Sequence, residues 1–274
     1  MKIFISSDME GTTGVVDWDQ VMIGGPRYEY YTELLTKEIN AAIEGAIAGG
    51  ATEFLVNDSH SKMANLRADQ LAGSARYLSG RFKPMYMMQG LDASFDAVFF
   101  ISYHGSMGSN GSTLSHTYFP TAFVEVRING VVAGESGINA LVAKAYGVPV
   151  VLVTGDATTA AELEPFSPRV HSAVVKESVS RFAADSLHPE AARKLIFEKA
   201  RLATQGINAA RQVTIELPVT FAMTFKTSDY AHLASRIKGV ERTGDFTAEI
   251  VSTDPLEIFQ TFITVVLLCR GLVE

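Results

Sequence analysis

Two carboxylates follow an apolar segment at the start of the chain. Residues 3–5 are β-prone and predict a short buried strand that leads into Asp8 and Glu10. The two acidic residues are two positions apart, so both side chains point to the same side if the extended backbone continues. Adjacent carboxylates repel each other, and a metal ion between them removes that cost. The segment therefore predicts metal binding, with a capped turn and a solvated Glu10 as the alternative.

Two histidines occupy comparable positions further along the chain. His60 follows the apolar segment 53–57, and His104 follows the apolar segment 96–103. An amphipathic helix is predicted between the first two strands, so strand, helix and strand form a βαβ unit with parallel strands. Ligands bind at the carboxyl ends of strands in such sheets, and we expect both histidines to lie beside the N-terminal carboxylates. The alternative for each histidine is a buried, hydrogen-bonded side chain without a ligand.

Glu135 completes a set of five candidate ligands. It lies in the first turn of a helix predicted from Gly134 to about Tyr146. Two imidazoles and three carboxylates suit zinc, with manganese or cobalt as substitutes. Five side chains are enough for two metals if each takes three protein ligands and one carboxylate bridges both. The candidate metal ligands are Asp8, Glu10, His60, His104 and Glu135.

His116 is a candidate catalytic residue. It lies between a Gly- and Ser-rich loop and a predicted β segment. A neutral imidazole near a metal-bound water can take or give a proton at pH 7. It could instead orient a tetrahedral intermediate or attack the substrate directly, and the sequence leaves these three roles open. Further side chains that could hold a peptide carboxylate or carbonyl, if they are not ordinary surface or ion-pair residues, are Lys62, Asn139, Lys176 and Arg181.

Composition narrows the classes of partner and compartment. The chain has 274 residues, of which 47% are hydrophobic, an ordinary globular balance that can bury a sizeable core. Its net charge of −7 argues against a nucleic-acid or anionic-membrane surface. The single cysteine, Cys269, excludes an internal disulfide and fits a reducing compartment. The N-terminus shows no signal-peptide pattern, and the longest apolar run, near residues 263–269, is too short to span a bilayer. We expect a soluble cytoplasmic protein with no nucleic-acid or membrane partner.

The order of predicted elements indicates an α/β fold. Strands that alternate with helices predict a mostly parallel sheet in a three-layer αβα arrangement. Asn129-Gly130 marks a hairpin between strands near 122–128 and 131–132. A smaller C-terminal α/β domain is expected, with its first strand at 213–217. The expected domains are residues 1–188, a metal-binding catalytic α/β domain, and residues 189–274, the smaller α/β domain.

Five short motifs surround the candidate residues. They are Ser7-Asp8-Met9-Glu10-Gly11, Val56-Asn57-Asp58-Ser59-His60-Ser61-Lys62-Met63, Tyr103-His104, Ser115-His116 and Gly134-Glu135. Together they resemble the zinc-dependent D-aminopeptidase family found in bacterial dipeptide-transport operons. The likeness covers most of the chain and becomes loose after about residue 205.

The resemblance implies a dinuclear zinc peptidase, with two zinc ions per chain, that removes N-terminal D-amino acids from short peptides. It assigns metal ligation to the five candidate ligands, with Asp8 as the bridge, and catalysis to His116. It also implies a homo-oligomer that encloses the sites, with a ring-shaped decamer as one form. One alternative is a dinuclear metal phosphoesterase, although the chain lacks a Gly-rich phosphate loop with Lys. The other is a non-enzymatic peptide- or metal-binding protein, which would leave His116 without a role.

The segment 118–123 holds three aromatic residues beside the predicted hairpin. Exposed aromatic patches mark interfaces, so this segment is expected to pack on a neighbouring subunit. The alternative is that these aromatic side chains face the second domain.

Overall fold

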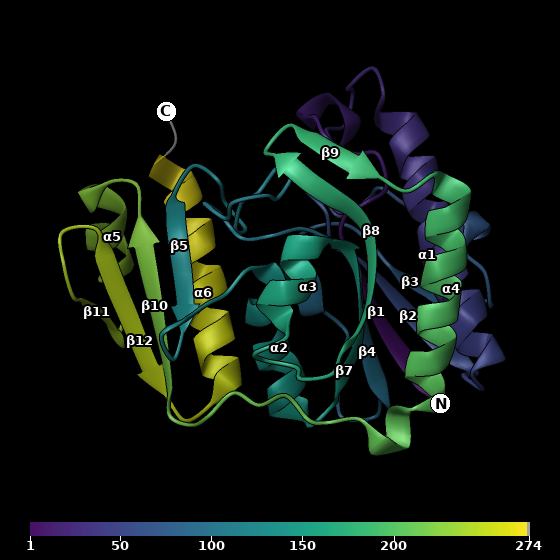
Figure 1. Ribbon diagram of the computed structural model, residues 1–274. Coiled ribbons are helices and arrows are strands. Elements are labelled where there is room, and N and C mark those ends of the chain that lie inside the picture. The colour runs from purple at the N-terminus through teal and green to yellow at the C-terminus, as the bar shows by residue number, and fades with distance from the viewer. Residues whose placement is uncertain (273–274) are drawn as a thin grey trace.

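The computed structural model describes residues 1–272, which form two β-sheets with helices around and between them (Figure 1). The larger sheet has the strand order β3-β2-β1-β4-β7-β8-β9, in which β9 is antiparallel to β8 and the other neighbours pair in parallel. The predicted mostly parallel sheet is confirmed. Its strands are β1 (Lys2–Ser7), β2 (Glu53–Asp58), β3 (Arg76–Leu78), β4 (Ala97–Tyr103), β7 (Val150–Asp156), β8 (His171–Ser180) and β9 (Ala183–Ser186).

Helices cover both faces of the larger sheet, as Figure 1 shows. On one face α1 (Tyr28–Ala48) packs with α4 (Pro189–Gln205), and on the other lie α2 (Glu135–Tyr146) and α3 (Ala157–Leu163). Strand side chains alternate between faces, so Ile3 and Ile5 pack in the core under α1 and α4, whereas Phe4 packs in the core that contains α2. The predicted three-layer arrangement is therefore confirmed.

The smaller sheet is antiparallel, with the order β11-β12-β10-β5-β6. The long helix α6 (Pro255–Cys269) lies between this sheet and α2, and α5 (Ser228–Ala234) packs against α6 and the strands (Figure 1). One apolar core continues from β4 through α2 and α6 to β10, so the two sheets form one packed body. The strands are β5 (Phe123–Ile128), β6 (Val131–Val132), β10 (Val219–Phe225), β11 (Val240–Arg242) and β12 (Thr247–Ser252). Short 3-10 helices lie at Trp18–Gln20, Ala68–Gln70, Tyr86–Met88, Ile207–Ala209 and Arg270–Leu272.

The two sheets do not divide the chain between residues 188 and 189. The β5–β6 hairpin precedes that point but pairs with β10, and α4 follows it but packs on α1 and the larger sheet. Elements of the two sheets therefore alternate along the chain. The expected domains 1–188 and 189–274 stay a prediction. The strand expected at 213–217 is wrong: these residues lie in no strand, and Thr214 bonds instead to the backbone of Phe166.

Helix α6 is the most apolar helix of the described chain. Together with the turn after it, the stretch Pro255–Leu272 has a mean hydropathy of 1.4 and is long enough to cross a membrane by composition. It is longer than the apolar run expected from the sequence, but 44% of it is buried inside the protein. Core helices of soluble proteins can have the same length and apolar composition. Phe259 and Phe262 are fully buried in the core. Burial also raises the pKa of the Cys269 thiol to about 12, which keeps it unreactive.

Two of the three aromatic residues in segment 118–123, Tyr118 and Phe123, are buried inside the protein. The rings of Tyr118 and Phe123 lie 5.0 and 5.4 Å from the ring of Phe262 on α6. The expectation that segment 118–123 packs on a neighbouring subunit is therefore wrong for these two side chains, and the alternative holds. The hairpin is not isolated, because β5 pairs with β10 along its length.

Candidate functional site

The candidate ligands meet where the strand order of the larger sheet reverses. From β1 the chain passes through α1 to β2 on one side, and it later returns to β4 on the other side of β1. The crevice at the carboxyl ends of the strands at such a point is a preferred binding place in α/β sheets. Asp8 follows β1, His60 follows β2 and His104 follows β4. The topology therefore brings together residues that are far apart in the sequence.

Asp8 lies between two histidines. Its Oδ1 is 3.4 Å from Nδ1 of His60, and its Oδ2 is 3.4 Å from Nε2 of His104. Glu10 Oε2 is 3.0 Å from His60 Nδ1, and Glu135 Oε1 is 3.8 Å from His104 Nε2. All five side chains are buried. Asp8 contacts both histidines, as expected of a carboxylate that bridges two metals, and the ligand atoms of Asp8, Glu10 and His104 also lie within 4.8 Å of one another.

His116 lies beside the same group. Its ring stacks on the ring of His104, with 4.3 Å between centroids, and its Nε2 is 3.6 Å from Glu135 Oε1. Ligand atoms of His104, His116 and Glu135 all lie within 4.8 Å of one another. Unlike the five candidate ligands, the His116 side chain keeps 12% of its surface exposed. It therefore borders both the polar cluster and the open space in front of it.

A backbone carbonyl oxygen holds the ring of each of the three histidines in a defined orientation. Nε2 of His60 lies 2.7 Å from Val21 O, and Nδ1 of His104 lies 2.8 Å from Gly105 O. Nδ1 of His116 lies 2.9 Å from Leu114 O. A carbonyl only accepts, so each of these ring nitrogens carries the proton it donates, and the other nitrogen of each ring faces the carboxylates. This is the hydrogen-bonding pattern that fixes the tautomer of a metal-binding histidine.

Burial and neighbouring charges shift the pKa values of Asp8, His60 and His104. Burial alone would lower the pKa values of His60 and His104, but Glu10 and Asp8 raise that of His60 well above its usual range. Asp8 and Glu135 raise the pKa of His104 to about 10. Burial would raise the pKa of Asp8, but its contacts with the two histidines hold it well below its usual range. Without a metal, these residues therefore favour an imidazolium–carboxylate state.

Two other groups are shifted toward their neutral forms. Burial, reinforced by the charge of Asp8, raises the pKa of Glu135 to about 8. Burial, reinforced by the charge of His104, lowers the pKa of His116 to about 4. A cluster of groups whose pKa values are moved this far is typical of a functional site.

Two buried atoms at the centre of the cluster have no hydrogen-bond partner among residues 1–272. They are Oδ2 of Asp8 and Nε2 of His104. Buried polar atoms are almost always bonded in proteins, so an unbonded pair that faces each other calls for a missing partner. A cation would satisfy both atoms, and a set of imidazoles and carboxylates is a donor set that suits zinc. The residues present therefore fit a metal.

The loop that carries Glu10 is fixed from two sides. A Cβ at Gly11 would lie 2.0 Å from the carbonyl oxygen of Tyr103, so only glycine allows this approach to β4. The buried ammonium of Lys176 on β8 donates to the carbonyls of Glu10 and Val15, at 2.5 and 2.7 Å. Lys176 therefore holds the loop rather than a substrate, contrary to one of the roles considered from the sequence.

A chain of buried hydrogen bonds supports Glu135. Its Oε1 accepts from the backbone N–H of Tyr118 at 2.8 Å, and the hydroxyl of Tyr118 lies 2.6 Å from Asn139 Oδ1. Asn139 Nδ2 donates to the hydroxyl of Tyr103 at 2.9 Å, which in turn lies 2.7 Å from Ser6 Oγ. Asn139 is thus part of the interior, and neither it nor Lys62 lines the cavity described next.

The cluster opens into a cavity of about 310 Å³. Asp8, Glu10 and Glu135 form an acidic part of its lining, together with His60 and His116. The sequence analysis missed the opposite charge: Arg81 and Arg270 also line it. The hydrophobic and aromatic lining comes from Trp18, Met22, Tyr86, Met87, Tyr118, Phe119 and Pro120.

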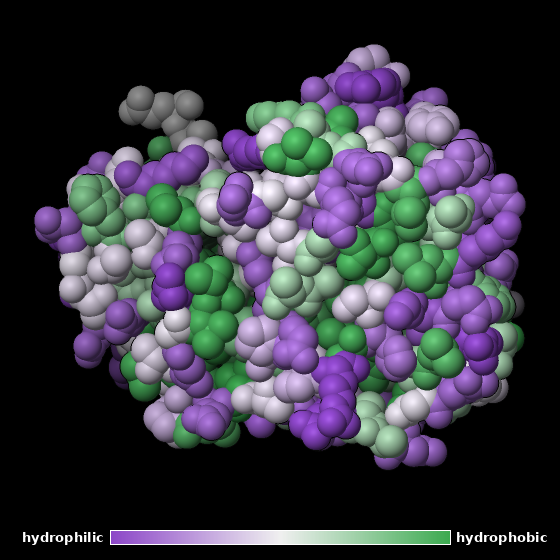
Figure 2. Space-filling model, in the orientation of Figure 1, coloured by the Kyte–Doolittle hydropathy of each residue, from purple (hydrophilic) through white to green (hydrophobic). Residues whose placement is uncertain are grey.

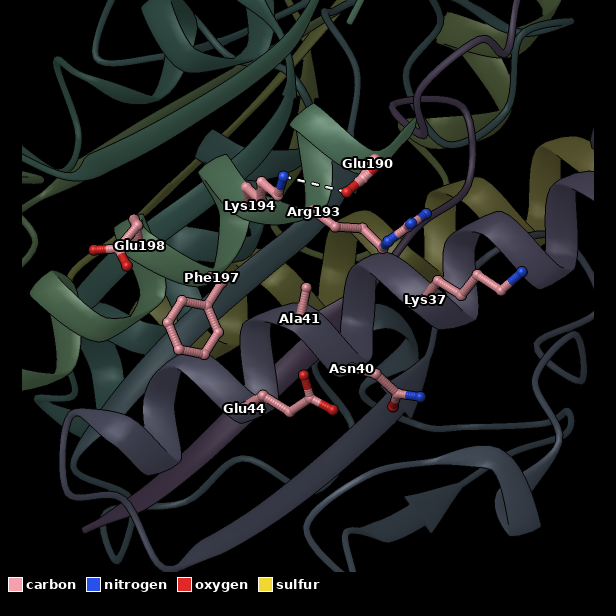
Figure 3. A pocket seen from close by; sticks show the side chains of 9 residues that line it. All are labelled: Lys37, Asn40, Ala41, Glu44, Glu190, Arg193, Lys194, Phe197 and Glu198. Carbon is pink, nitrogen blue, oxygen red and sulfur yellow. Dashed lines mark ion pairs between the residues drawn. The ribbon is translucent and has the colours of Figure 1, made fainter. Parts of the chain in front are cut away.

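A larger cavity of about 690 Å³ lies elsewhere, between α1 and α4 (Figure 3). Its side chains carry both charges, and Lys194 pairs with Glu190 at 3.2 Å. None of the expected site residues lines it, and its lining contains no histidine or cysteine. The smaller cavity, which the expected site residues line, is therefore the candidate active site.

The family pattern described as peptidase M55, D-aminopeptidase, matches residues 1–264. This chain belongs to the D-aminopeptidase family. The resemblance noted in the sequence is confirmed.

Sequence and structure comparisons of this D-aminopeptidase family member both match a Bacillus subtilis D-aminopeptidase over nearly the whole chain. The D-aminopeptidase of Bacillus subtilis (strain 168) is 37% identical over 264 residues, which is 96% of each chain. Among solved structures, the Zn-dependent D-aminopeptidase DppA from Bacillus subtilis, described as a self-compartmentalizing protease, matches with a TM-score of 0.93. It shares 35% sequence identity, and the match covers 98% of both chains.

Proposed function

We propose that this chain is a zinc-dependent aminopeptidase that removes D-amino acids from the N-terminus of short peptides. The observation that carries the proposal is the buried pair of Asp8 Oδ2 and His104 Nε2, which face each other without a hydrogen-bond partner among residues 1–272. Family membership and the zinc-dependent relative support both the metal and the reaction. They also favour a peptidase over the phosphoesterase and the non-enzymatic binding protein considered from the sequence.

In this proposal two zinc ions are held by five side chains. Glu10 and His60 would serve one ion and His104 and Glu135 the other, with Asp8 bridging both, because each carboxylate oxygen of Asp8 faces a different histidine. When bound, zinc polarises a substrate carbonyl and lowers the pKa of its water, which is the chemistry that peptide-bond hydrolysis needs.

His116 would move the protons of the reaction. Its Nδ1–H is committed to Leu114 O, so Nε2 carries the lone pair and points toward Glu135. Burial favours the neutral imidazole and, in the metal-free chain, lowers the pKa of His116 to about 4 together with the charge of His104. Nε2 can therefore accept a proton from the attacking water and return it to the leaving amine. The ring of Trp18, with its centroid 5.6 Å from that of the His116 ring, packs against this imidazole.

Activity and metal content together test the proposal. Zinc-loaded protein should release p-nitroaniline from D-Ala-p-nitroanilide and should leave p-nitrophenyl phosphate intact. His116→Ala should lower kcat by about 10²- to 10⁴-fold, the range for loss of a general acid–base group, with zinc content unchanged. Turnover of the phosphate ester alone would reject the peptidase, and unchanged kcat in His116→Ala would remove His116 from the reaction.

Assembly and location complete the proposal. The self-compartmentalizing relative supports a homo-oligomer that encloses the cavities, and a ring-shaped decamer is the form proposed here. Peptides would be the substrates, and the absence of a basic excess in the composition argues against nucleic acid as a partner. A cytoplasmic location is proposed on the single buried cysteine, which needs no oxidising compartment.

A further inference from the structure

We propose that Arg270 binds the C-terminal carboxylate of the peptide and so selects short peptides with a free C-terminus. The inference rests on the proposed function, because it adds the far end of the substrate to the same cavity. The match to the family pattern ends at residue 264, so Arg270 lies beyond it.

Arg270 is held at the cavity wall. It follows the last residue of α6, and its Nη2 donates to the Tyr86 hydroxyl at 2.7 Å. Its guanidinium carbon lies 5.6 Å from the centroid of the Phe119 ring and 5.8 Å from that of Tyr86, which is the range of cation–π contacts. Two aromatic rings and a hydroxyl therefore orient a partly buried guanidinium that also lines the cavity.

The charge of Arg270 has no carboxylate partner among residues 1–272. Its neighbours Tyr86 and Phe119 are neutral, so they position the guanidinium without neutralising it. A guanidinium offers several N–H donors in a plane that matches a carboxylate. An anionic group of the substrate would supply such a partner.

The lining of the cavity carries both charges. Asp8, Glu10 and Glu135 supply negative charge, where an N-terminal ammonium and the scissile carbonyl would bind, and Arg81 and Arg270 supply positive charge. The two are linked through the wall: the ring of Tyr86, which holds Arg270, lies 5.5 Å from that of Tyr118, whose N–H bonds Glu135. A short peptide is a zwitterion with the same two charges at its ends.

The size of the cavity limits the length of that zwitterion. A volume of about 310 Å³ is at the small end of the range for small-molecule sites, which is about 300–1,000 Å³. An extended residue adds about 3.3–3.6 Å, so a di- or tripeptide spans roughly 7–11 Å between its ends. Longer peptides would carry their carboxylate past Arg270 and would lose this contact.

Paired substrates test the proposal in the zinc-loaded full-length protein. D-Ala-Gly and D-Ala-Gly-Gly would be compared with their C-terminal amides. We expect kcat/KM to favour each acid over its amide by about 10- to 100-fold, the range for a hydrogen bond to a charged group, mainly through KM.

Arg270→Gln should remove this preference and leave the amides unchanged, and Arg270→Lys should restore part of it. Arg67→Gln, at an exposed ion pair with Asp69, is the matched control and should keep the preference.

Binding to metal-free protein separates this inference from the proposed function. Isothermal titration of the chelator-treated wild type should show tighter binding of D-Ala-Gly than of its amide, with the difference lost in Arg270→Gln. Equal binding of acid and amide by the wild type, or an equal loss of both in the variant at an unchanged melting temperature, would overturn the role of Arg270. If the zinc-loaded protein hydrolysed no peptide while the acid preference in binding persisted, the proposed function would fail and the carboxylate site would stand.

Discussion

Asp8 Oδ2 and His104 Nε2 lie 3.4 Å apart in the interior, and neither makes a hydrogen bond with residues 1–272. The other oxygen of Asp8 lies equally close to His60. One carboxylate thus faces two imidazoles that come from different strands, β2 and β4, on either side of β1. The first prediction follows from this central position of Asp8.

Replacing Asp8 should remove both metals, because a bridge serves both. Asp8→Asn keeps the volume of the side chain but removes its charge, and zinc content should fall from about two ions per chain to well below one. Glu10→Gln should lower zinc content by about one ion, since the direct contact of Glu10 is with His60, at 3.0 Å. Elemental analysis after dialysis measures both. A full zinc complement in Asp8→Asn would reject the bridge.

Zinc binding should release protons. The surrounding carboxylates raise the pKa of His60 well above its usual range and that of His104 to about 10, so the protonated imidazoles are favoured in metal-free protein, and Glu135 with a pKa of about 8 is largely protonated at pH 7.5. Metal ligation requires the deprotonated forms. About two to three protons per chain should leave when zinc saturates the site. Calorimetric titrations in buffers of different ionisation enthalpy give this number, and a value near zero would contradict the assignment of the histidines.

The same shifts predict how the stability of metal-free protein depends on pH. His60, His104 and Glu135 have raised pKa values in the folded state, so between pH 6.5 and 8 the folded chain binds more protons than the unfolded chain. The free energy of unfolding should therefore fall as the pH rises through this window. Urea unfolding of chelator-treated protein at pH 6.5 and pH 8 tests the sign. Saturating zinc should abolish or reverse the trend, because protons no longer occupy the site.

Lys176 should stabilise the loop that carries Glu10. Lys176→Met leaves the carbonyls of Glu10 and Val15 buried without their donor, which should cost about 2–6 kcal/mol of unfolding free energy, at about 1–3 kcal/mol per unsatisfied group. Because Glu10 moves with this loop, zinc affinity should fall as well. Lys144→Met is the matched control, since its ammonium donates to Val213 O at 3.2 Å, away from the site. Equal zinc affinity in both variants would show that the anchor does not position Glu10.

The sequence predicted the larger sheet and the meeting of the five candidate ligands, because both depend on local patterns. Apolar strands that end in Asp8, His60 and His104 are visible in the sequence, and parallel pairing places their ends at one edge. The sequence did not reveal that the 123–132 hairpin joins strands about 90 residues later, because pairing at that separation leaves no local mark. Arg270 was missed for the same reason, since its contact with Tyr86 spans 184 positions.

The hairpin of β8 and β9 connects the surface to His116. Val179 and Phe182 at its tip are 75% and 52% exposed, and Figure 2 shows hydrophobic side chains where the tip lies in Figure 1. The carbonyl of Arg181 between them accepts from Leu114 N–H at 2.8 Å, and Leu114 O in turn accepts from His116 Nδ1. An apolar contact made by the tip would therefore also hold the catalytic candidate in place.

The last prediction is that this hairpin is a subunit contact and that breaking it lowers activity without removing zinc. Val179→Asp with Phe182→Asp should shift the protein toward the 29.6 kDa monomer in size-exclusion chromatography with light scattering. Its kcat should fall at least about tenfold at an unchanged zinc content, because the support of Leu114 loosens, and a loss of even about 1.4 kcal/mol of positioning energy has this effect. Phe246→Asp is the control, since Phe246 is 50% exposed beside the smaller sheet. A wild type that is a fully active monomer, or a hairpin variant that stays assembled, would rule the contact out.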